Sequence, residues 1–419
     1  MRILIKNVIL EKRKVDVLIE GEKISKIGRN LNLKVDEKID GKEEKAVIPG
    51  LINCHTHSAM ILLRGLGEDL FLKDWLEKVI WPIEDKLSED DVYWGTKLAI
   101  LEMIKSGTTT FNEMYFYPEA QIEATKEMGM RGFLGLVLVD FSTKDCDRKS
   151  IEEKFPKLEK ILKNSSSIKL TIAPHAIYTV SKENLIWAKN FAKRYKLLIH
   201  MHLSETQNEI KESLKKYKMR PVEYLEKIGF LGKNCIFAHS IWLSEKEIEI
   251  LEKRRCGLVY NPTSNMKLVS GVFRWGKIKN TKINVCLGTD GPASNNSLNL
   301  FSEMKIGALL QKIENKNPVA ISAKEIFQMA TKNGALALKI NAGEIKVGKL
   351  ADLTLIDLNK IEMFPNYDLI SNLVYSDAKS CVSDVICNGK ILMRDGKIEG
   401  EEKILKIAKF KLQNASWRK

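Results

Sequence analysis

Eight apolar, strand-like runs alternate with helical patterns through the middle of this 419-residue chain. We expect strands at residues 47–54, 108–114, 132–139, 168–174, 197–203, 234–239, 256–260 and 284–289. Helical patterns lie between most of them, at 89–105, 150–163, 181–194, 206–217, 244–252 and 298–312. Alternating strands and helices are typical of a parallel α/β sheet, and eight strands suffice to close it. We therefore predict a TIM-like (β/α)₈ barrel over residues 47–343.

The two ends of the chain have a different sequence pattern, with short strand-like runs joined by tight turns. These patterns cover residues 1–46 and 344–400. We predict that both ends pair into one small β-sandwich domain beside the barrel, and that residues 401–419 form a C-terminal helical tail. A barrel of about 250 residues with a second module fits the length.

Composition sets limits on location and partners. Apolar residues make up 44% of the chain, yet none of the runs reaches the roughly 18 apolar residues of a membrane span. The amino terminus turns charged where a signal peptide would be apolar. Seven scattered cysteines without a Cys-x-x-Cys motif suit a reducing compartment. We expect a soluble, cytoplasmic protein with no membrane partner.

The formal net charge of +14 raises the question of nucleic acid. Lysines are interleaved with glutamates along the whole chain, as at 42–45 and 245–247, which indicates solvated helix faces. We expect no nucleic-acid partner. A non-catalytic nucleic-acid-binding protein remains the alternative from charge alone, and salt-dependent binding would test it.

The chain has six histidines, and each lies at or just before the C-terminal end of a strand-like run, where a barrel places its chemistry. Side chains alternate along a strand, so His55 and His57 share one face. By the same rule His202 is a candidate ligand, and His200 a residue that faces inward or supports a ligand. The remaining two are His175 and His239.

Two carboxylates complete the candidate site. Glu205 follows His202 by three residues, and Asp290 ends the eighth expected strand, with Gly288 and Gly291 allowing close backbone approach. Three imidazoles and one carboxylate suit Zn²⁺, with Fe²⁺ or Mn²⁺ as alternatives. Such a metal lowers the pKa of a bound water, and a nearby Glu and a neutral His can move protons and stabilise charge. The set indicates metal-assisted hydrolytic attack on an sp² carbon.

These motifs resemble the amidohydrolase superfamily, whose pattern is carried by the segments 49–57, 202–205 and 288–292, by His239, and by 343–353. The resemblance implies one divalent metal ion per subunit, held by His55, His57, His202 and Asp290. It also implies that Glu205, His239 and Asp290 are catalytic. The fourth strand ends in Ala-Pro-His175, without the lysine that carries a bridging carbamate in the binuclear branch.

Within that superfamily the chain is most similar to the S-adenosylhomocysteine and 5′-methylthioadenosine deaminases, which include 5′-deoxyadenosine-type enzymes. The similarity is carried by residues 63–66, 72–76, 80–84, 107–110 and 173–175. It implies deamination of an adenine nucleoside to the inosine analogue and ammonia, and a homo-oligomer. Substrate contacts are implied for Glu84 on the ribose hydroxyls, for His175 and Trp75, and for Glu205 and Asp290.

One departure concerns the 5′ group. Relatives carry an arginine after the glycine of the third strand, associated with the amino-acid tail of S-adenosylhomocysteine, whereas Gly135 is followed here by Leu136 and Val137. We expect a preference for 5′-methylthioadenosine, 5′-deoxyadenosine or adenosine, unless a residue such as Arg148 supplies the charge; the nearest basic residue is Arg131, at the start of the strand.

Two other reaction classes are alternatives. A different amidohydrolase, such as a guanine or triazine deaminase or a chlorohydrolase, would not need a ribose-binding Glu84. A cytidine-type zinc deaminase would need a His-x-Glu and Pro-Cys-x-x-Cys signature, which the sequence lacks.

Overall fold

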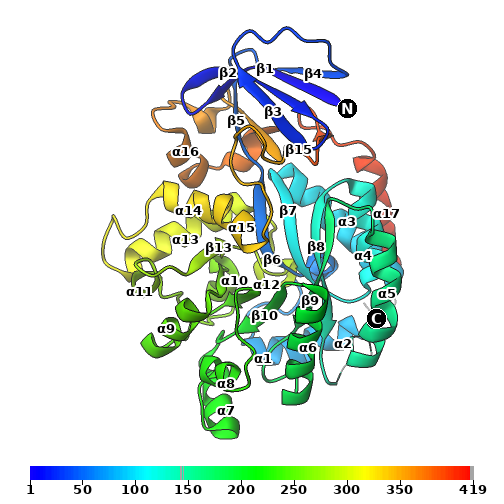
Figure 1. Ribbon diagram of the computed structural model, residues 1–419, viewed down its shortest axis with the longest axis vertical. Helices are drawn as coiled ribbons and strands as arrows, with labels where there is room; N and C mark the ends of the chain where they lie inside the picture. The colour runs from blue at the N-terminus through cyan, green and yellow to red at the C-terminus, as the bar shows by residue number, and fades with distance from the viewer. Residues whose placement is uncertain (142–143, 145, 416–419) are drawn as a thin grey trace.

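The computed structural model describes residues 1–141, 144 and 146–415, and it contains two separate sheets (Figure 1). The first is an eight-stranded sheet in which every neighbouring pair is parallel and strands follow in chain order. The last strand packs back against the first, and the Asp290 N–H donates to the His55 carbonyl at 3.0 Å just beyond the strand ends. The predicted barrel is confirmed. Its strands are β6 (Leu51–Thr56), β7 (Thr108–Met114), β8 (Arg131–Leu138), β9 (Ile168–Pro174), β10 (Ile199–Leu203), β11 (Cys235–His239), β12 (Gly257–Tyr260) and β13 (Asn284–Leu287).

Helices surround the barrel, and the six predicted from sequence are present with ends shifted by at most two residues. They are α3 (Glu89–Lys105), α5 (Arg148–Leu162), α6 (Lys182–Tyr195), α7 (Gln207–Tyr217), α9 (Glu245–Arg254) and α13 (Leu300–Glu314). Their starts are encoded locally: the side chains of Ser88, Ser181 and Ser244 each accept a main-chain N–H of the first turn. Such caps contribute about 1 kcal/mol each.

The other helical segments are mostly short and lie in the connections. They are η1 (Ser58–Leu63), α1 (Leu72–Trp75), η2 (Leu76–Ile80), α2 (Trp81–Glu84), α4 (Pro118–Met128), α8 (Pro221–Lys227), α10 (Pro262–Lys267), α11 (Trp275–Ile278), α12 (Pro292–Asn295), α14 (Ala323–Met329), α15 (Lys332–Ala337), η3 (Ile361–Met363), α16 (Leu369–Tyr375) and η4 (Ala378–Cys381). The expected tail at 401–419 is helix α17 (Glu401–Asn414), which packs on α3; positions 416–419 lie outside the described residues.

The second sheet joins the two ends of the chain, as predicted, and its eight strands form one mixed sheet at the top of Figure 1. The junction is the antiparallel pair β5–β14, in which Pro49 lies opposite Leu353. The strand order is β16-β15-β14-β5-β1-β2-β3, with β4 beside β1. The strands are β1 (Arg2–Leu10), β2 (Arg13–Glu20), β3 (Lys23–Gly28), β4 (Glu37–Asp40), β5 (Lys45–Pro49), β14 (Leu353–Asp357), β15 (Val382–Cys387) and β16 (Lys390–Met393).

One expected strand is in fact two. The run at 47–54 divides at Gly50, so that Lys45–Pro49 belongs to the small sheet and only Leu51–Thr56 to the barrel. A Cβ at Gly50 would lie 2.3 Å from the Thr109 side chain, so the chain can pass from one sheet to the other only with glycine here. The Pro49-Gly50 pair is the sequence signal of this break, but the apolar, buried residues on both sides of it read as one continuous strand.

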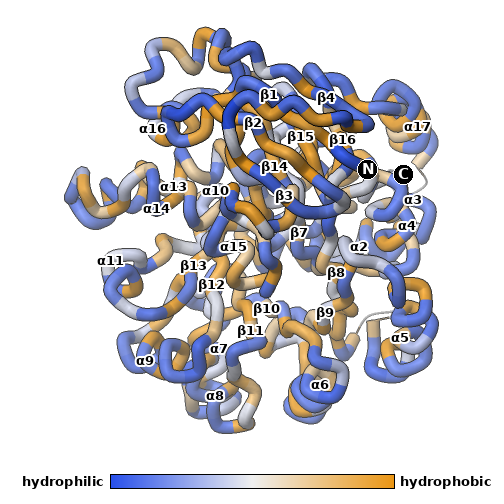
Figure 2. The backbone as a smooth tube through the Cα atoms, turned by 45° about the horizontal axis from the view of Figure 1, so that its top comes forward, coloured by the Kyte–Doolittle hydropathy of each residue, from blue (hydrophilic) through white to orange (hydrophobic). Residues whose placement is uncertain are grey.

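Apolar residues concentrate on the strands of both sheets, whereas the outer helices are mixed (Figure 2). The barrel and its helices share one large core, and the small sheet has a core of its own. Across the described part of the chain, none of the helices combines the length and the apolar character needed to cross a membrane.

A buried ion pair joins the barrel to the small sheet. Arg131 starts β8, at the end of the barrel opposite the strand termini that carry the histidines, and its guanidinium donates to both Asp352 oxygens at 2.7 and 3.2 Å. Both side chains are 2% exposed. Arg131 also donates to the Asn388 side chain and the Ser166 carbonyl. Its role is structural, so it is not a source of charge for a substrate.

The substitution Arg131→Met leaves the Asp352 carboxylate buried without its cation. We expect the free energy of unfolding in urea to fall by about 3–5 kcal/mol. Arg254→Met is the matched control, because Arg254 pairs with Glu226 at the surface and its loss should change little. Equal effects of the two substitutions would contradict the role of the buried pair.

Candidate functional site

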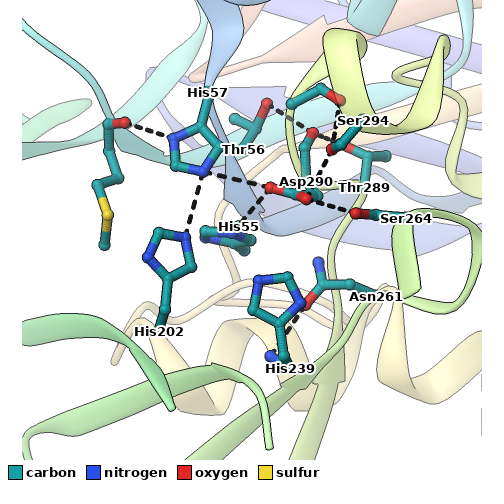
Figure 3. A network of polar contacts seen from close by, with 12 residues as sticks. His55, Thr56, His57, His202, His239, Asn261, Ser264, Thr289, Asp290 and Ser294 are labelled. Carbon is teal, nitrogen blue, oxygen red and sulfur yellow. Dashed lines mark hydrogen bonds and ion pairs between the residues drawn. The ribbon is translucent and has the colours of Figure 1, made fainter. Parts of the chain in front are cut away.

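Four side chains converge at the carboxyl ends of the barrel strands (Figure 3). His55 is the next-to-last residue of β6 and His57 follows the strand, His202 lies on β10, and Asp290 follows β13. The Asp290 Oδ1 atom lies 3.1 Å from His55 Nε2 and 3.2 Å from His57 Nε2, and His57 Nε2 lies 3.3 Å from His202 Nε2. One ligand atom from each of the four lies within 4.8 Å of all the others. No second group of this kind occurs among the described residues.

Hydrogen bonds on the far side of each ring determine which nitrogen is bare. His57 Nδ1 lies 2.6 Å from the Met114 carbonyl, and His202 Nδ1 lies 3.0 Å from the His175 carbonyl. A carbonyl oxygen only accepts, so both Nδ1 atoms carry the proton. In the neutral rings both Nε2 atoms are then bare and face the centre of the site.

His55 is held by another histidine instead of a carbonyl. Its Nδ1 lies 2.9 Å from the Nε2 of His200, which is fully buried. Burial lowers the pKa of His55 to about 3, and burial also holds the pKa of His200 well below its usual value, so both rings are neutral. His200 therefore supports a ligand, as one of the two interpretations of the sequence held, and the buried His55 Nε2 has no hydrogen-bond partner.

The donor set fits a divalent cation. Bare nitrogen lone pairs and a carboxylate oxygen repel one another at these separations unless a positive charge lies between them. A proton can supply this positive charge. Burial alone would lower the pKa of His57, but the Asp290 carboxylate outweighs burial and raises it to about 9. Three imidazoles and one carboxylate in this geometry are typical of zinc-type sites.

Asp290 is fixed at both oxygens. Oδ1 faces the histidines, whereas Oδ2 accepts from the Ser264 and Ser294 hydroxyls at 2.6 and 2.7 Å. Although burial works the other way, the neighbouring His55 and His57 rings hold the pKa of Asp290 well below its usual value, so it is an anion. A Cβ at Gly288 would lie 2.8 Å from the His55 nitrogen, so this close approach needs glycine, as predicted.

Glu205 and His239 lie beside the four donors. His239 Nε2 is 3.8 Å from Glu205 Oε2, and the Ser270 hydroxyl donates to Glu205 Oε1 at 3.1 Å. Burial, followed by the charge of Asp290, raises the pKa of Glu205 to about 8. Burial lowers the pKa of His239 to about 4. Near neutral pH the site thus offers a protonated carboxyl group and a neutral imidazole.

A cavity of about 210 Å³ opens over these groups. Its lining brings together nearly all of the side chains predicted from sequence: His57, Trp75, Glu84, His175, His202, Glu205, His239 and Asp290. His55, fully buried, lies beneath them. The cavity opens into a wider outer groove of about 780 Å³, with which it shares Leu72, Leu76, Trp81, Tyr178, Glu205 and Leu268.

The structure corrects the argument from Leu136. Leu136 does not line the cavity; it points to the other side of β8, toward Tyr117 and Ile151. The lining residues from this strand and just beyond it are Val137, Val139 and Phe141. Arg148 is also outside the lining and pairs with Glu152. Leu136 therefore says nothing about the charge that a substrate would meet.

Sequence reasoning missed the segment Asn261-Pro-Thr-Ser-Asn265. It follows β12, which carries no candidate catalytic residue, and yet it contacts two such residues: Ser264 binds Asp290, and Asn265 binds His239. The position of this segment could have revealed its role, because polar residues at the carboxyl end of a barrel strand are expected to contribute to the site.

Comparisons with known proteins agree over almost the full chain. The amidohydrolase family model matches residues 46–392. A 5-methylthioadenosine/S-adenosylhomocysteine deaminase of Thermococcus sibiricus is 47% identical over 383 residues, which are 91% of this chain and 90% of that protein. A 5'-deoxyadenosine deaminase of Methanocaldococcus jannaschii is 47% identical over 97% of this chain and 98% of that protein. The crystal structure of an adenosine deaminase from Xanthomonas campestris with bound zinc has a TM-score of 0.93 and 31% identity, covering 100% and 97% of the two chains.

The four-donor site predicts one tightly bound metal ion per chain. Elemental analysis of Zn²⁺-loaded protein should give about one ion, and His202→Ala should lose it because a donor is gone. His200→Ala removes only the support of His55, so it should keep the stoichiometry and weaken affinity by about 10–100-fold in chelator competition. Unchanged zinc affinity in His202→Ala would refute the site.

Proposed function

The chain belongs to the amidohydrolase family, as its motifs predicted, and on this basis we propose that it deaminates adenine nucleosides hydrolytically to the inosine analogue and ammonia. The observation that carries the proposal is the convergence, around one cavity, of four metal donors and the buried carboxyl groups of Glu205 and Glu84. The names of the Thermococcus and Methanocaldococcus relatives support the nucleoside class.

We propose Zn²⁺ as the ion held by His55, His57, His202 and Asp290. The zinc in the Xanthomonas structure and the nitrogen-rich donor set both favour it over Mn²⁺ or Fe²⁺. When bound, such an ion acts as a Lewis acid that makes water nucleophilic near neutral pH.

The protein side chains then move the protons. Glu205, which holds a proton near neutral pH, gives it to N1 of the adenine ring and so makes C6 electrophilic. The anionic Asp290 accepts a proton from the water whose oxygen adds to C6. That proton passes to the exocyclic amine, the C6–N bond breaks and ammonia leaves, while the second water proton returns from the C6 hydroxyl to Glu205 as the C6 carbonyl forms. The atoms balance as nucleoside plus water giving the inosine analogue plus ammonia.

Glu84 is the proposed ribose contact. It is 5% exposed, it lines the cavity, and its Oε1 atom is buried without a hydrogen-bond partner. Burial raises its pKa to about 7. A pair of ribose hydroxyls would satisfy this carboxyl group, which a free base could not do. His175, whose Nδ1 lies 3.0 Å from the Thr179 hydroxyl, presents its other nitrogen to the nucleoside, and Trp75 forms a wall.

For the 5′ substituent we propose a small, uncharged group. The described lining of the cavity contains no lysine or arginine, and its β8 side consists of Val137, Val139 and Phe141. A carboxylate placed there would lose its hydration without gaining a cation. These residues, and not Leu136, carry the argument.

Glu205→Gln keeps the size of the side chain and removes its titratable proton. We expect kcat for 5′-methylthioadenosine to fall by about 10²–10⁴, because proton transfer to N1 is lost. Zinc content should stay at the wild-type level, since Glu205 is not among the four donors. The readout is the ultraviolet shift from adenine to hypoxanthine, and full activity in this variant would refute the assignment.

The 5′ preference is tested with three nucleosides that differ stepwise. We expect higher kcat/KM for 5′-methylthioadenosine and 5′-deoxyadenosine than for S-adenosylhomocysteine. The analogue of S-adenosylhomocysteine that lacks only the carboxylate should recover part of the difference, because it has nearly the same length without the charge. S-adenosylhomocysteine as the best substrate would contradict an uncharged 5′ site.

A further inference from the structure

Four histidine rings surround the candidate metal centre, but only three belong to the group of converging donors. The ring centroid of His239 lies 5.4 Å from that of His55 and 5.3 Å from that of His202, the same spacing that separates His57 from His202. Distance from the other rings therefore does not explain why His239 is outside the donor group, whereas the hydrogen-bond partner of its ring does.

His239 Nδ1 lies 2.8 Å from the Nδ2 atom of Asn265, and both side chains are about 1% exposed. An amide nitrogen donates and cannot accept, so Nδ1 of His239 must be the acceptor. In the neutral ring the single proton is then on Nε2, which lies on the cavity side, 3.8 Å from Glu205.

At the proposed ligands His57 and His202, the hydrogen bond at Nδ1 runs in the direction opposite to that at His239. His57 and His202 each place Nδ1 against a carbonyl oxygen, which takes the ring proton there and leaves Nε2 bare. His239 places Nδ1 against an N–H donor, which moves the proton to Nε2. A ring nitrogen that carries a proton has no lone pair for a metal ion.

We propose that Asn265 is a positioning residue that fixes His239 in the Nε2–H tautomer. His239 is thereby excluded from the metal and acts as a hydrogen-bond donor at the reacting centre, not as a base. At His57, His202 and His239, the polarity of one hydrogen bond per ring separates two ligands from one donor. The donor role rests on the proposed deamination; the tautomer does not.

The main chain of His239 is held by the same segment. His239 has a φ of 67°, in the left-handed region, and its N–H donates to the Asn261 Oδ1 atom at 3.3 Å. The Nε2–H so placed can donate to the oxygen that adds to C6, where negative charge develops. Removal of one such donor costs roughly 10²–10³ in kcat.

The first measurement is the ¹⁵N chemical shifts of the histidine rings in wild-type, zinc-loaded protein, with His239 assigned by its loss in His239→Gln. A protonated Nε2 and a bare Nδ1 are expected. The opposite tautomer, or coordination of His239 to zinc, overturns the proposal whatever the activity. Because wild type decides this point, the test does not depend on the folding of an Asn265 variant.

The second measurement uses Asn265→Asp, which keeps the shape of the side chain and replaces the donor by an acceptor. A proton at Nδ1 is expected, with kcat for 5′-methylthioadenosine lowered by about 10²–10³ and KM changed by less than about threefold. Asn261→Asp is the matched control: it places the same charge on the same segment but still accepts from the His239 main chain, so the ring tautomer should stay that of wild type.

These outcomes separate the two proposals. If Asn265→Asp leaves Nδ1 bare, Asn265 does not fix the tautomer; if it moves the proton with kcat unchanged, the donor role is wrong. If wild type has the expected tautomer but turns over no adenine nucleoside, the proposed function fails while the role of Asn265 stands.

Discussion

The site depends on one electrostatic constraint: three bare imidazole nitrogens and one carboxylate oxygen face a common centre, and they repel one another unless a cation lies there. Every neighbouring contact maintains this arrangement. Main-chain carbonyls take the Nδ1 protons of His57 and His202, the His200 ring lies against Nδ1 of His55, and two serines hold the far oxygen of Asp290. Left-handed backbone at His239 and Asp290, with φ of 67° and 63°, is strain that is kept at the site and supported by the rest of the fold.

The two ends of the barrel differ in what their buried polar groups do. At the carboxyl ends of the strands, buried carboxyl groups and neutral imidazoles are held out of water, which is unfavourable for folding but useful for proton transfer. At the opposite end, Arg131 and Asp352 form a fully paired contact that ties β8 to the small sheet. The small sheet, whose two halves join through β5 and β14, lies against this end of the barrel, where the Thr354 hydroxyl donates to the Gly107 carbonyl just before β7 (Figure 1).

Much of the fold and the four donors could be predicted from sequence, because the relevant signals are local. Helix caps, apolar runs and a histidine at a strand end are each visible within a few residues. What failed depended on tertiary context. The break at Pro49-Gly50 is flanked on both sides by buried apolar residues that belong to different sheets, which local sequence does not distinguish. Strand β8 is buried on both faces, so its sequence does not show that Val137, and not Leu136, faces the cavity. The roles of Asn265 and Ser264 depend on hydrogen bonds to residues 25 or more positions away, and no local pattern encodes their polarity.

The most direct test of this account is anomalous diffraction at the zinc edge from crystals of the zinc-loaded protein. The account predicts a single strong peak, about 2.0–2.2 Å from the Nε2 atoms of His55, His57 and His202 and from Asp290 Oδ1, with His239 outside bonding distance. A peak bonded to His239 or to an Nδ1 atom would contradict it, because either requires proton positions that the hydrogen bonds around the rings do not allow. Two peaks in the barrel would also contradict it, because the described residues offer one group of donors.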